Sequence, residues 1–146
     1  MGNRAAIVIT DNDRNYSPTI YIHWGGDTES VKGIIRGAFD LNCMRAGEAN
    51  YTCARIIGYI HEHVFDGNLS LGVKENGWRA AGKPNINKEA DWMDNGVYIF
   101  NCENGRLEQY LSENEKVLDE QIITEQELLD APESLVAFNK REGKIR

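Results

Sequence analysis

The run Val97-Tyr98-Ile99-Phe100-Asn101-Cys102 constrains the fold more than any other segment of this chain. It is apolar at successive positions at its start, and turn residues bound it on both sides, Asp94-Asn95-Gly96 before it and Asn104-Gly105 after it. Side chains of a strand alternate between the two faces of a sheet, so we expect this strand to lie centrally. Asn104-Gly105 predicts a two-residue type I′ hairpin, with Arg106 to Leu111 as the return strand.

The first half of the chain predicts a hairpin followed by two helices. Two β-rich runs, Ala5 to Thr10 and Thr19 to Trp24, are joined by a polar loop and favour an antiparallel pair. Apolar residues then recur with helical spacing from Val31 to Phe39, after a candidate N-cap at Asp27 or Thr28. A second helical stripe runs from about Tyr51 to Val64, and a short strand is expected over Leu69 to Val73.

The end of the chain is polar and acidic. Residues 112–121 are expected to extend the preceding strand or to form a short helix, and Thr124-x-x-Glu127 is a capping box that predicts a helix. The predicted fold class is α+β, with a mainly antiparallel sheet of about five strands, two helices packed on one face and a short helical acidic tail. The expected division is a core domain over 1–111 and a C-terminal extension over 112–146, packed on the core or projecting from it.

Composition narrows the classes of partner and the compartment. The 146 residues carry a net charge of −7, and residues 103–146 hold 6 basic and 11 acidic groups. An acidic surface repels phosphate backbones and disfavours general nucleic-acid binding, while it suits a basic protein partner. No apolar run approaches the length of a membrane span, and the first ten residues do not resemble a signal peptide. The three cysteines form no C-x-x-C, which favours buried reduced thiols and a cytoplasmic protein.

Glycines mark two places where the chain could approach another group closely. Gly25-Gly26 before a helix could bind an anion through backbone N–H groups, but Asp27 and Glu29 already supply carboxylates to that helix end. Gly33 and Gly37 lie four residues apart on the predicted helix. This pair admits either close packing of a neighbouring segment or simple tolerance of exposed glycine.

Metal and nucleophile sites find little support. His23, His61 and His63 are the only histidines, and His61 and His63 point to opposite sides of a helix, so no metal site is predicted. Cys53 with His23 or His61 has the residue types of a nucleophile pair, but burial on an apolar stripe would raise the pKa of the thiol. No catalytic residue and no cofactor is predicted.

Recognition by aromatic side chains is the better supported kind of site. Trp24, Trp78 and Trp92 lie near predicted loop edges, where a ring can be buried on one side and contact a partner on the other. The alternative is that these rings only close the edge of the core. The candidate binding residues are His23, Trp24, Trp78, Trp92, Asp94 and Asn95.

Three blocks of sequence point to a family. They are Gly2-Asn3-Arg4-Ala5, Tyr21-Ile22-His23-Trp24-Gly25-Gly26 and Asp91-Trp92-Met93-Asp94-Asn95-Gly96-Val97-Tyr98. Together they resemble a family of small proteins from bacteriophages and bacterial mobile elements that open with N-R-A, carry Y-x-H-W-x-G-G and end on W-D-N-G-x-Y. The resemblance covers about residues 2–100, and Met93 interrupts the usual Trp-Asp pair. The resemblance implies an origin in phages or mobile elements, but it implies no activity. Small phage proteins without catalytic motifs are often binders of host complexes, and a binder is therefore the function that the resemblance suggests.

Three functions remain open from the sequence. The first is a non-enzymatic binding protein of phage or mobile-element origin that engages a host protein complex and antagonises host defence. The second is a binder of a small, nucleotide-like ligand, with His23, Trp24 and Trp92 around the pocket. The third is a hydrolase with a His/Cys/Asp site. A host protein is the expected partner, a homodimer is left open, and neither a membrane nor general nucleic acid is expected.

Overall fold

Two strands that are far apart in the sequence form the centre of the sheet. The computed structural model describes residues 3–41, 44–45, 47–64, 71–74, 94–112 and 114–131. Strands β1 (Ala5–Thr10) and β4 (Val97–Asn101) run parallel, in register from Ala6 opposite Val97 to Thr10 opposite Asn101. Both are almost entirely buried, which confirms the central position expected for the segment that starts at Val97.

The other strand pairs are antiparallel. The order across the six-stranded sheet is β3-β2-β1-β4-β5-β6, where β2 is Thr19–Ile22, β3 is Leu71–Lys74 and β5 is Arg106–Ser112. The predicted α+β class and mainly antiparallel sheet are therefore confirmed, and so is the β1–β2 hairpin. The parallel β1–β4 pair was not predicted.

The sixth strand corrects the expected count of about five. Glu115–Gln121 forms β6, a separate strand antiparallel to β5, rather than an extension of β5 or a helix. Most of its side chains are exposed and only Leu118 is partly buried, so an edge strand of this kind lacks the apolar alternation that identifies strands in a sequence. The sheet therefore continues past residue 111.

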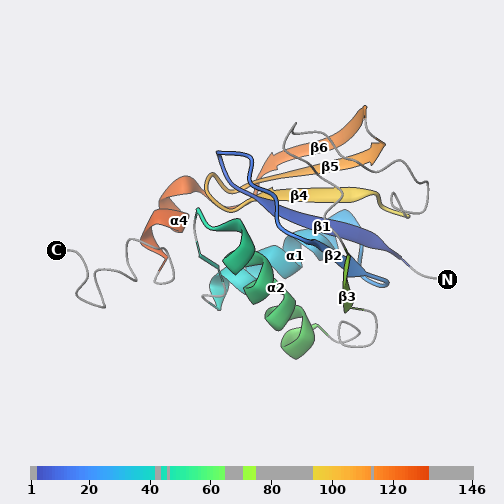
Figure 1. The fold of residues 1–146 in the computed structure, drawn as a ribbon, viewed down its shortest axis with the longest axis horizontal. Helices are drawn as coiled ribbons and strands as arrows, with labels where there is room; N and C mark the ends of the chain where they lie inside the picture. The colour runs from blue at the N-terminus through green and yellow to red at the C-terminus, as the bar shows by residue number, and fades with distance from the viewer. Residues whose placement is uncertain are drawn as a thin grey trace.

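Helices α1 (Thr28–Asp40) and α2 (Ala49–His63) lie on one face of the sheet, as Figure 1 shows and as predicted. The core between the helices and the sheet is built from alternate strand residues and from the apolar stripe of each helix. Its members include Ile7, Ile9, Ile20, Ile22, Val31, Ile35, Ile56, Ile60, Tyr98, Phe100 and Leu107. The opposite face of the sheet holds a smaller apolar cluster of Ala6, Val8, Val97 and Ile99, with Tyr16 and Tyr110 packed against it.

The two helical glycines have different surroundings. A Cβ added at Gly37 would overlap the hydroxyl of Tyr59, whose side chain reaches across from α2. A Cβ added at Gly33 would meet nothing within 4 Å. Gly37 therefore makes room for a side chain of the neighbouring helix, while Gly33 is a tolerated glycine.

The turn between β4 and β5 differs from the predicted type I′ turn. Four residues separate Asn101 from Arg106, and the Gly105 N–H donates to the Asn101 carbonyl at 2.8 Å. Gly105 has a φ of +80° but Asn104 does not have a positive φ, whereas type I′ needs two such residues. The reason is local: the Asn101 side-chain oxygen accepts from the N–H groups of Glu103 (2.8 Å) and Asn104 (3.0 Å), which holds a wider turn.

The predicted capping box starts α4 (Glu125–Asp130), the last helix in the described part of the chain. Thr124 Oγ1 accepts from the Glu127 N–H at 3.0 Å, and Glu127 Oε1 accepts from the Thr124 N–H at 3.1 Å. Glu127 also pairs with Arg36 of α1 at 2.7 Å, and Leu128 is buried in the main core. Over the described residues, the helices lack the length and apolar character needed to cross a bilayer.

Candidate functional site

The amino ends of β1 and β4 lie side by side because the two strands are parallel, and this brings together residues from the first and third sequence blocks. The Arg4 N–H donates to Asp94 Oδ2 at 3.0 Å, and the Arg4 guanidinium donates to both carboxylate oxygens at 3.2 Å. Asn95 donates through its backbone and its side chain to the Arg4 carbonyl, both at 3.0 Å. Asn95 Nδ2 also donates to Asn3 Oδ1 at 2.6 Å.

The second block, between β2 and α1, joins the same place through Asn3. The Asn3 N–H donates to the His23 carbonyl and the Gly26 N–H donates to the Asn3 carbonyl, both at 2.8 Å. A Cβ at Gly26 would lie 2.6 Å from the Asn3 carbonyl oxygen and 2.8 Å from Ala5 Cβ. Gly26 is therefore needed for the close approach of two backbones. We call Asn3, Arg4, Gly26, Asp27, Asp94 and Asn95 the amino-end cluster.

Asp27 caps α1 and belongs to the cluster at the same time. Its carboxylate accepts from the Ser30 N–H at 3.2 Å, from Ser30 Oγ at 2.8 Å and from Asn3 Nδ2 at 3.0 Å. These hydrogen bonds, that from Ser30 Oγ first, lower the pKa of Asp27. Of the two candidate N-caps, Asp27 and Thr28, the structure has Asp27, and its carboxylate occupies the helix end that an external anion would use.

A buried hydrogen-bonded chain connects the cluster to the core. Tyr98 Oη donates to the Gly26 carbonyl at 2.7 Å, and burial raises the pKa of this phenol. Gln109 Nε2 donates to the Asn95 carbonyl at 2.9 Å, and Gln109 Oε1 accepts from Thr28 Oγ1 at 3.0 Å. Sequence reasoning missed Tyr98 and Gln109 because both stand at strand positions that read as ordinary sheet residues.

His23 and Trp24 lie beside this cluster. Tyr21 Oη and His23 Nδ1 are 2.9 Å apart, and the His23 and Trp24 rings meet edge-on with centroids 5.0 Å apart. The side chain of Trp24 is 42% exposed. Arg4 is the main cause of the lowered pKa of Asp94.

The structure thus brings four of the six predicted binding residues to one end of the sheet: His23, Trp24, Asp94 and Asn95. Trp78 and Trp92, the other two, lie outside the described residues. The structure gives Asp94 and Asn95 mainly structural contacts, whereas Trp24 presents an exposed ring.

The Cys–His pairs suggested by residue type are not brought together. Cys53 Sγ contacts the Pro18 carbonyl at 3.6 Å, and about 16 Å of extended chain separates Pro18 from His23. His61 lies about 12 Å further along α2 than Cys53. Burial raises the pKa of the Cys53 thiol, which favours the unreactive protonated form. Within the described ranges, no group of three or more His, Cys, Asp or Glu residues is arranged to hold a metal ion.

A cavity at the opposite, carboxyl ends of β1 and β4 is lined by residues that the sequence analysis did not single out. The available signal was the run of polar residues at or just after the end of each strand: Asp11 to Asn15 after β1, and Asn101, Glu103 and Asn104 at the end of β4. Such segments are also typical of ordinary turns and loops, and they were predicted as such.

No protein-family model, curated protein or solved structure matches this chain.

Proposed function

We propose that this chain is a non-enzymatic binding protein that engages another protein through Trp24 and His23. The observation that carries the proposal is the exposed Trp24 ring, 42% accessible, beside a half-buried His23. Tryptophan is among the residues that most often dominate the binding energy of protein interfaces. A large exposed aromatic ring on a loop is a ready anchor for a partner's pocket.

The backbone that presents this ring is already ordered. Hydrogen bonds from Asn3 to His23 and from Gly26 to Asn3 hold the loop on both sides of Trp24. The His23 ring packs edge-on against the indole. Because little freedom remains to be lost on binding, the entropic cost of forming an interface here is small.

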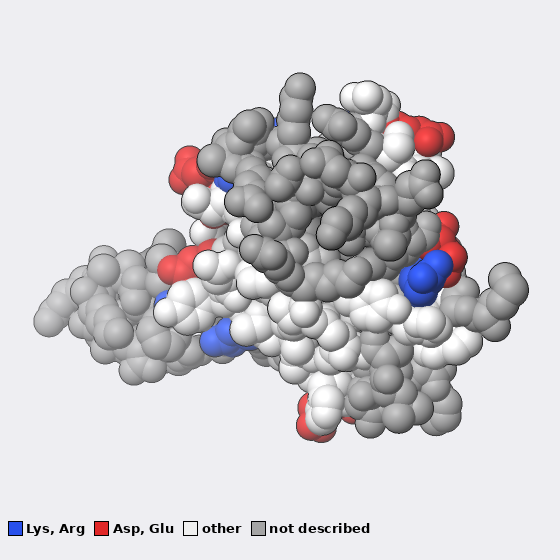
Figure 2. Space-filling view, turned by 45° about the vertical axis from the view of Figure 1, so that its right-hand side comes forward, with Lys and Arg blue, Asp and Glu red and all other residues white. Residues whose placement is uncertain are grey.

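The charged groups nearby form a polar border. Arg4 and Asp94 pair with each other, and their side chains are 42% and 41% exposed. Figure 2 shows one face of the molecule, on which the described basic and acidic side chains lie in small separate groups of both signs. An aromatic anchor with a polar border has the composition of a protein-binding patch.

The partner follows from the net charge and from the sequence resemblance. The chain carries a net charge of −7, which favours a partner with a basic face. The resemblance to phage and mobile-element proteins makes a host protein complex, including one that acts in defence, the partner we propose. The carboxylates of the amino-end cluster are held by hydrogen bonds within the chain, which supports binding rather than catalysis.

The test is affinity capture from a bacterial lysate with three baits. These are the wild-type chain, Trp24→Ala, and Tyr51→Ala as an aromatic control. Tyr51 is 55% exposed and lies at the start of α2, beside Asp11 at the other end of the sheet. We expect wild type and Tyr51→Ala to enrich the same protein and Trp24→Ala to lose it.

The captured protein is then purified and its affinity for each bait is measured. Truncation of an interface anchor should weaken binding by about 30-fold or more. The proposal fails if Trp24→Ala binds within about threefold of wild type, or if wild type enriches nothing above a chain-free control. Each ring also has one contact within the chain, His23 beside Trp24 and the Arg45 guanidinium over Tyr51, so the thermal midpoints of the three baits are measured to check that both variants fold.

A further inference from the structure

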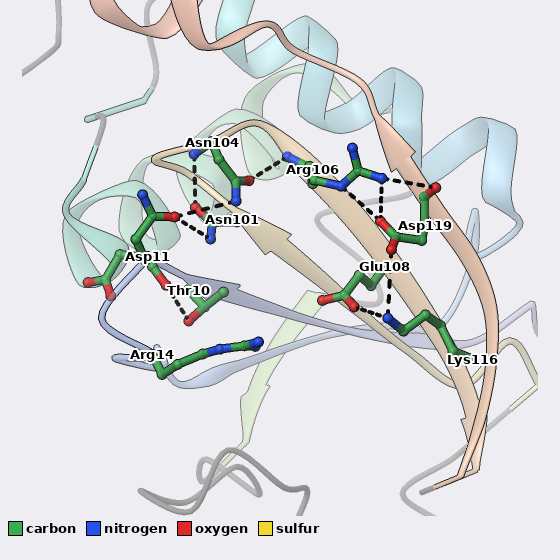
Figure 3. Close-up of a pocket in the computed structure, with 10 residues that line it drawn as sticks. Thr10, Asp11, Arg14, Asn101, Asn104, Arg106, Glu108, Lys116 and Asp119 are labelled. Atoms are coloured by element: carbon green, nitrogen blue, oxygen red, sulfur yellow. Dashed lines mark hydrogen bonds and ion pairs between the residues drawn. The ribbon is translucent and has the colours of Figure 1, made fainter.

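A polar cavity of about 350 Å³ opens where β1 and β4 end. Thr10 and Asn101, the last residues of these parallel strands, lie opposite each other in the sheet. β5 and β6 extend the lining, and all ten lining residues are polar or charged (Figure 3). Ligands of open sheets bind outside the carboxyl ends of parallel strands, and the volume is within the range of small-molecule sites.

The cavity lies on the face of the sheet that the helices do not cover. Leu107 packs into the helix-side core, so its neighbours Arg106 and Glu108 point to the opposite face. Thr10 lies two residues after Val8 on β1, so the two side chains are on the same face of the sheet, and Val8 belongs to the smaller apolar cluster on that face. This site is therefore separate from both the main core and the amino-end cluster.

The acidic groups of the lining already have partners. Asp119 Oδ1 accepts from the Arg106 guanidinium at 2.7 and 2.9 Å, and Glu108 Oε2 accepts from Lys116 Nζ at 2.7 Å. The buried carboxylate of Asp11 accepts from Asn15 and from the backbone N–H of Asp13. These contacts also occupy two of the three basic groups, Arg106 and Lys116.

Arg14 is the third basic group, and it differs from the other two. Its guanidinium donates to Tyr16 Oη at 3.4 Å, and no carboxylate in the described part of the chain pairs with it. Its φ is +64°, the only positive value at a described residue other than glycine. In Figure 3 its extended side chain lies along the cavity in the direction of Glu108. A cationic side chain is thus present where the backbone favours glycine.

Amide groups line the wall beside the strand ends. Asn12 Oδ1 accepts from Asn101 Nδ2 at 3.1 Å and from Asn104 Nδ2 at 3.4 Å. An amide nitrogen carries two N–H groups, so each of these two asparagines retains one donor for a ligand oxygen. The wall therefore offers hydrogen-bond donors next to a guanidinium.

The geometry points to a binding site for a small organic molecule with one negative charge, whose phosphodiester or carboxylate group pairs with Arg14. The rest of the ligand, rich in oxygen acceptors, faces Asn101 and Asn104. Three basic and three acidic residues line the cavity, and the three carboxylates would repel a molecule with several negative charges. A single anionic group matches Arg14, the one basic side chain of the lining that forms no ion pair with a carboxylate. Glu108 acts on Arg14 only at longer range, because its own ion pair is with Lys116.

The experiment is isothermal titration calorimetry of the full chain with three probes. Cyclic AMP supplies a phosphodiester, gluconate supplies a carboxylate on a hydroxyl-rich body, and ATP is the polyanion. We expect saturable binding of cyclic AMP or gluconate at one site per chain, and weaker binding of ATP. The probe that binds identifies which anionic group the site accepts.

Arg14→Asn and Arg14→Gly remove the charge and tolerate a positive φ, so both variants should keep the wild-type thermal midpoint. Each should weaken binding by about tenfold or more, the loss expected when a charge-assisted hydrogen bond is removed. Arg36→Asn, on the helix side of the sheet, is the matched control and should bind as wild type does. The inference is overturned if neither monoanion binds, if ATP binds most tightly, or if both Arg14 variants keep wild-type affinity.

Discussion

Asp94 holds Arg4 by main chain and side chain together: its Oδ2 accepts from the Arg4 N–H and Nε, and its Oδ1 accepts from Nη2. One carboxylate thus connects the residue before β1 to the turn before β4, two segments 90 residues apart in the chain. The hydrogen bonds from Arg4 lower the pKa of Asp94.

Asp94→Asn should reduce stability in a pH-dependent way. The pKa of Asp94 is lower in the folded state than in the unfolded state. The ionised carboxylate therefore stabilises the fold at pH values above the unfolded pKa of about 4. This stabilisation is lost as the pH falls through the lowered pKa of the folded state. Urea midpoints of wild type and variant should differ most near pH 7 and converge as the pH is lowered below about 4. Asp40→Asn, which removes an exposed pair with Arg36, is the control. A difference that stays constant down to about pH 2 would contradict this account.

Alanine should act in opposite ways at the two glycines of α1. Gly33→Ala should raise the free energy of unfolding by about 1 kcal/mol, since alanine favours helix and the added methyl group meets nothing. Gly37→Ala should lose this gain or destabilise, because its methyl group overlaps the Tyr59 hydroxyl. In a Tyr59→Ala background, Gly37→Ala should become stabilising. Chemical denaturation of wild type, the three single variants and the Gly37→Ala/Tyr59→Ala double variant gives the free energies of unfolding to compare. Equal effects of alanine at both glycines in the wild-type background would contradict the role proposed for Tyr59.

Cys102 should resist alkylation in the folded protein. The residue is fully buried, and burial raises the pKa of its thiol to about 11. Only roughly 0.1% of such a thiol is ionised at pH 8, and the thiolate is the form that reacts. Iodoacetamide labelling, read by mass spectrometry of the Cys102 peptide, should be at least about 100-fold slower than in urea and should rise steadily with pH. Equal labelling with and without urea would show that the thiol is accessible and ionised.

Loss of the capping box should loosen α4. Thr124→Ala removes the side-chain oxygen that accepts from the Glu127 N–H, at a cost of about 1 kcal/mol. Thr124→Ser keeps a hydroxyl and is the control. Hydrogen exchange should accelerate over residues 127–131 in the alanine variant alone. If exchange there is the same in both variants, contacts such as Arg36–Glu127, rather than the cap, hold the helix.

Local patterns explain which parts of the fold were predictable. The helix around Val31 to Phe39 and the box at Thr124 depend on neighbouring residues, and both were predicted. The cap of that helix was predicted at Asp27 or Thr28, and it is Asp27. β6 was missed because Glu115–Gln121 is exposed on both sides of an edge strand. The parallel pairing of β1 with β4 was missed because both strands are apolar on both faces, which indicates a central position but not the direction of a neighbour.

The residues of the candidate sites also divide into those that the sequence predicted and those that only the folded structure brings together. His23, Trp24, Asp94 and Asn95 were selected from sequence blocks, and the structure brings them together at the amino ends of β1 and β4. Arg14 was not selected, since an arginine in a polar loop resembles any solvated charge. Only the approach of the β5 and β6 side chains turns that loop into the wall of a cavity, and this approach depends on strand pairing across the whole sheet.

The parallel β1–β4 pair also sets an order for folding. β1 is synthesised before β4, and residues 11–96 are made between the two strands. During synthesis, the apolar edge of β1 that β4 will cover stays open, which is a hazard for pairing with other chains. Closing so long a loop is slow, so we expect refolding in milliseconds to seconds rather than microseconds. Refolding that finished within about 100 microseconds in a continuous-flow mixing experiment would exclude β1–β4 pairing as the late step.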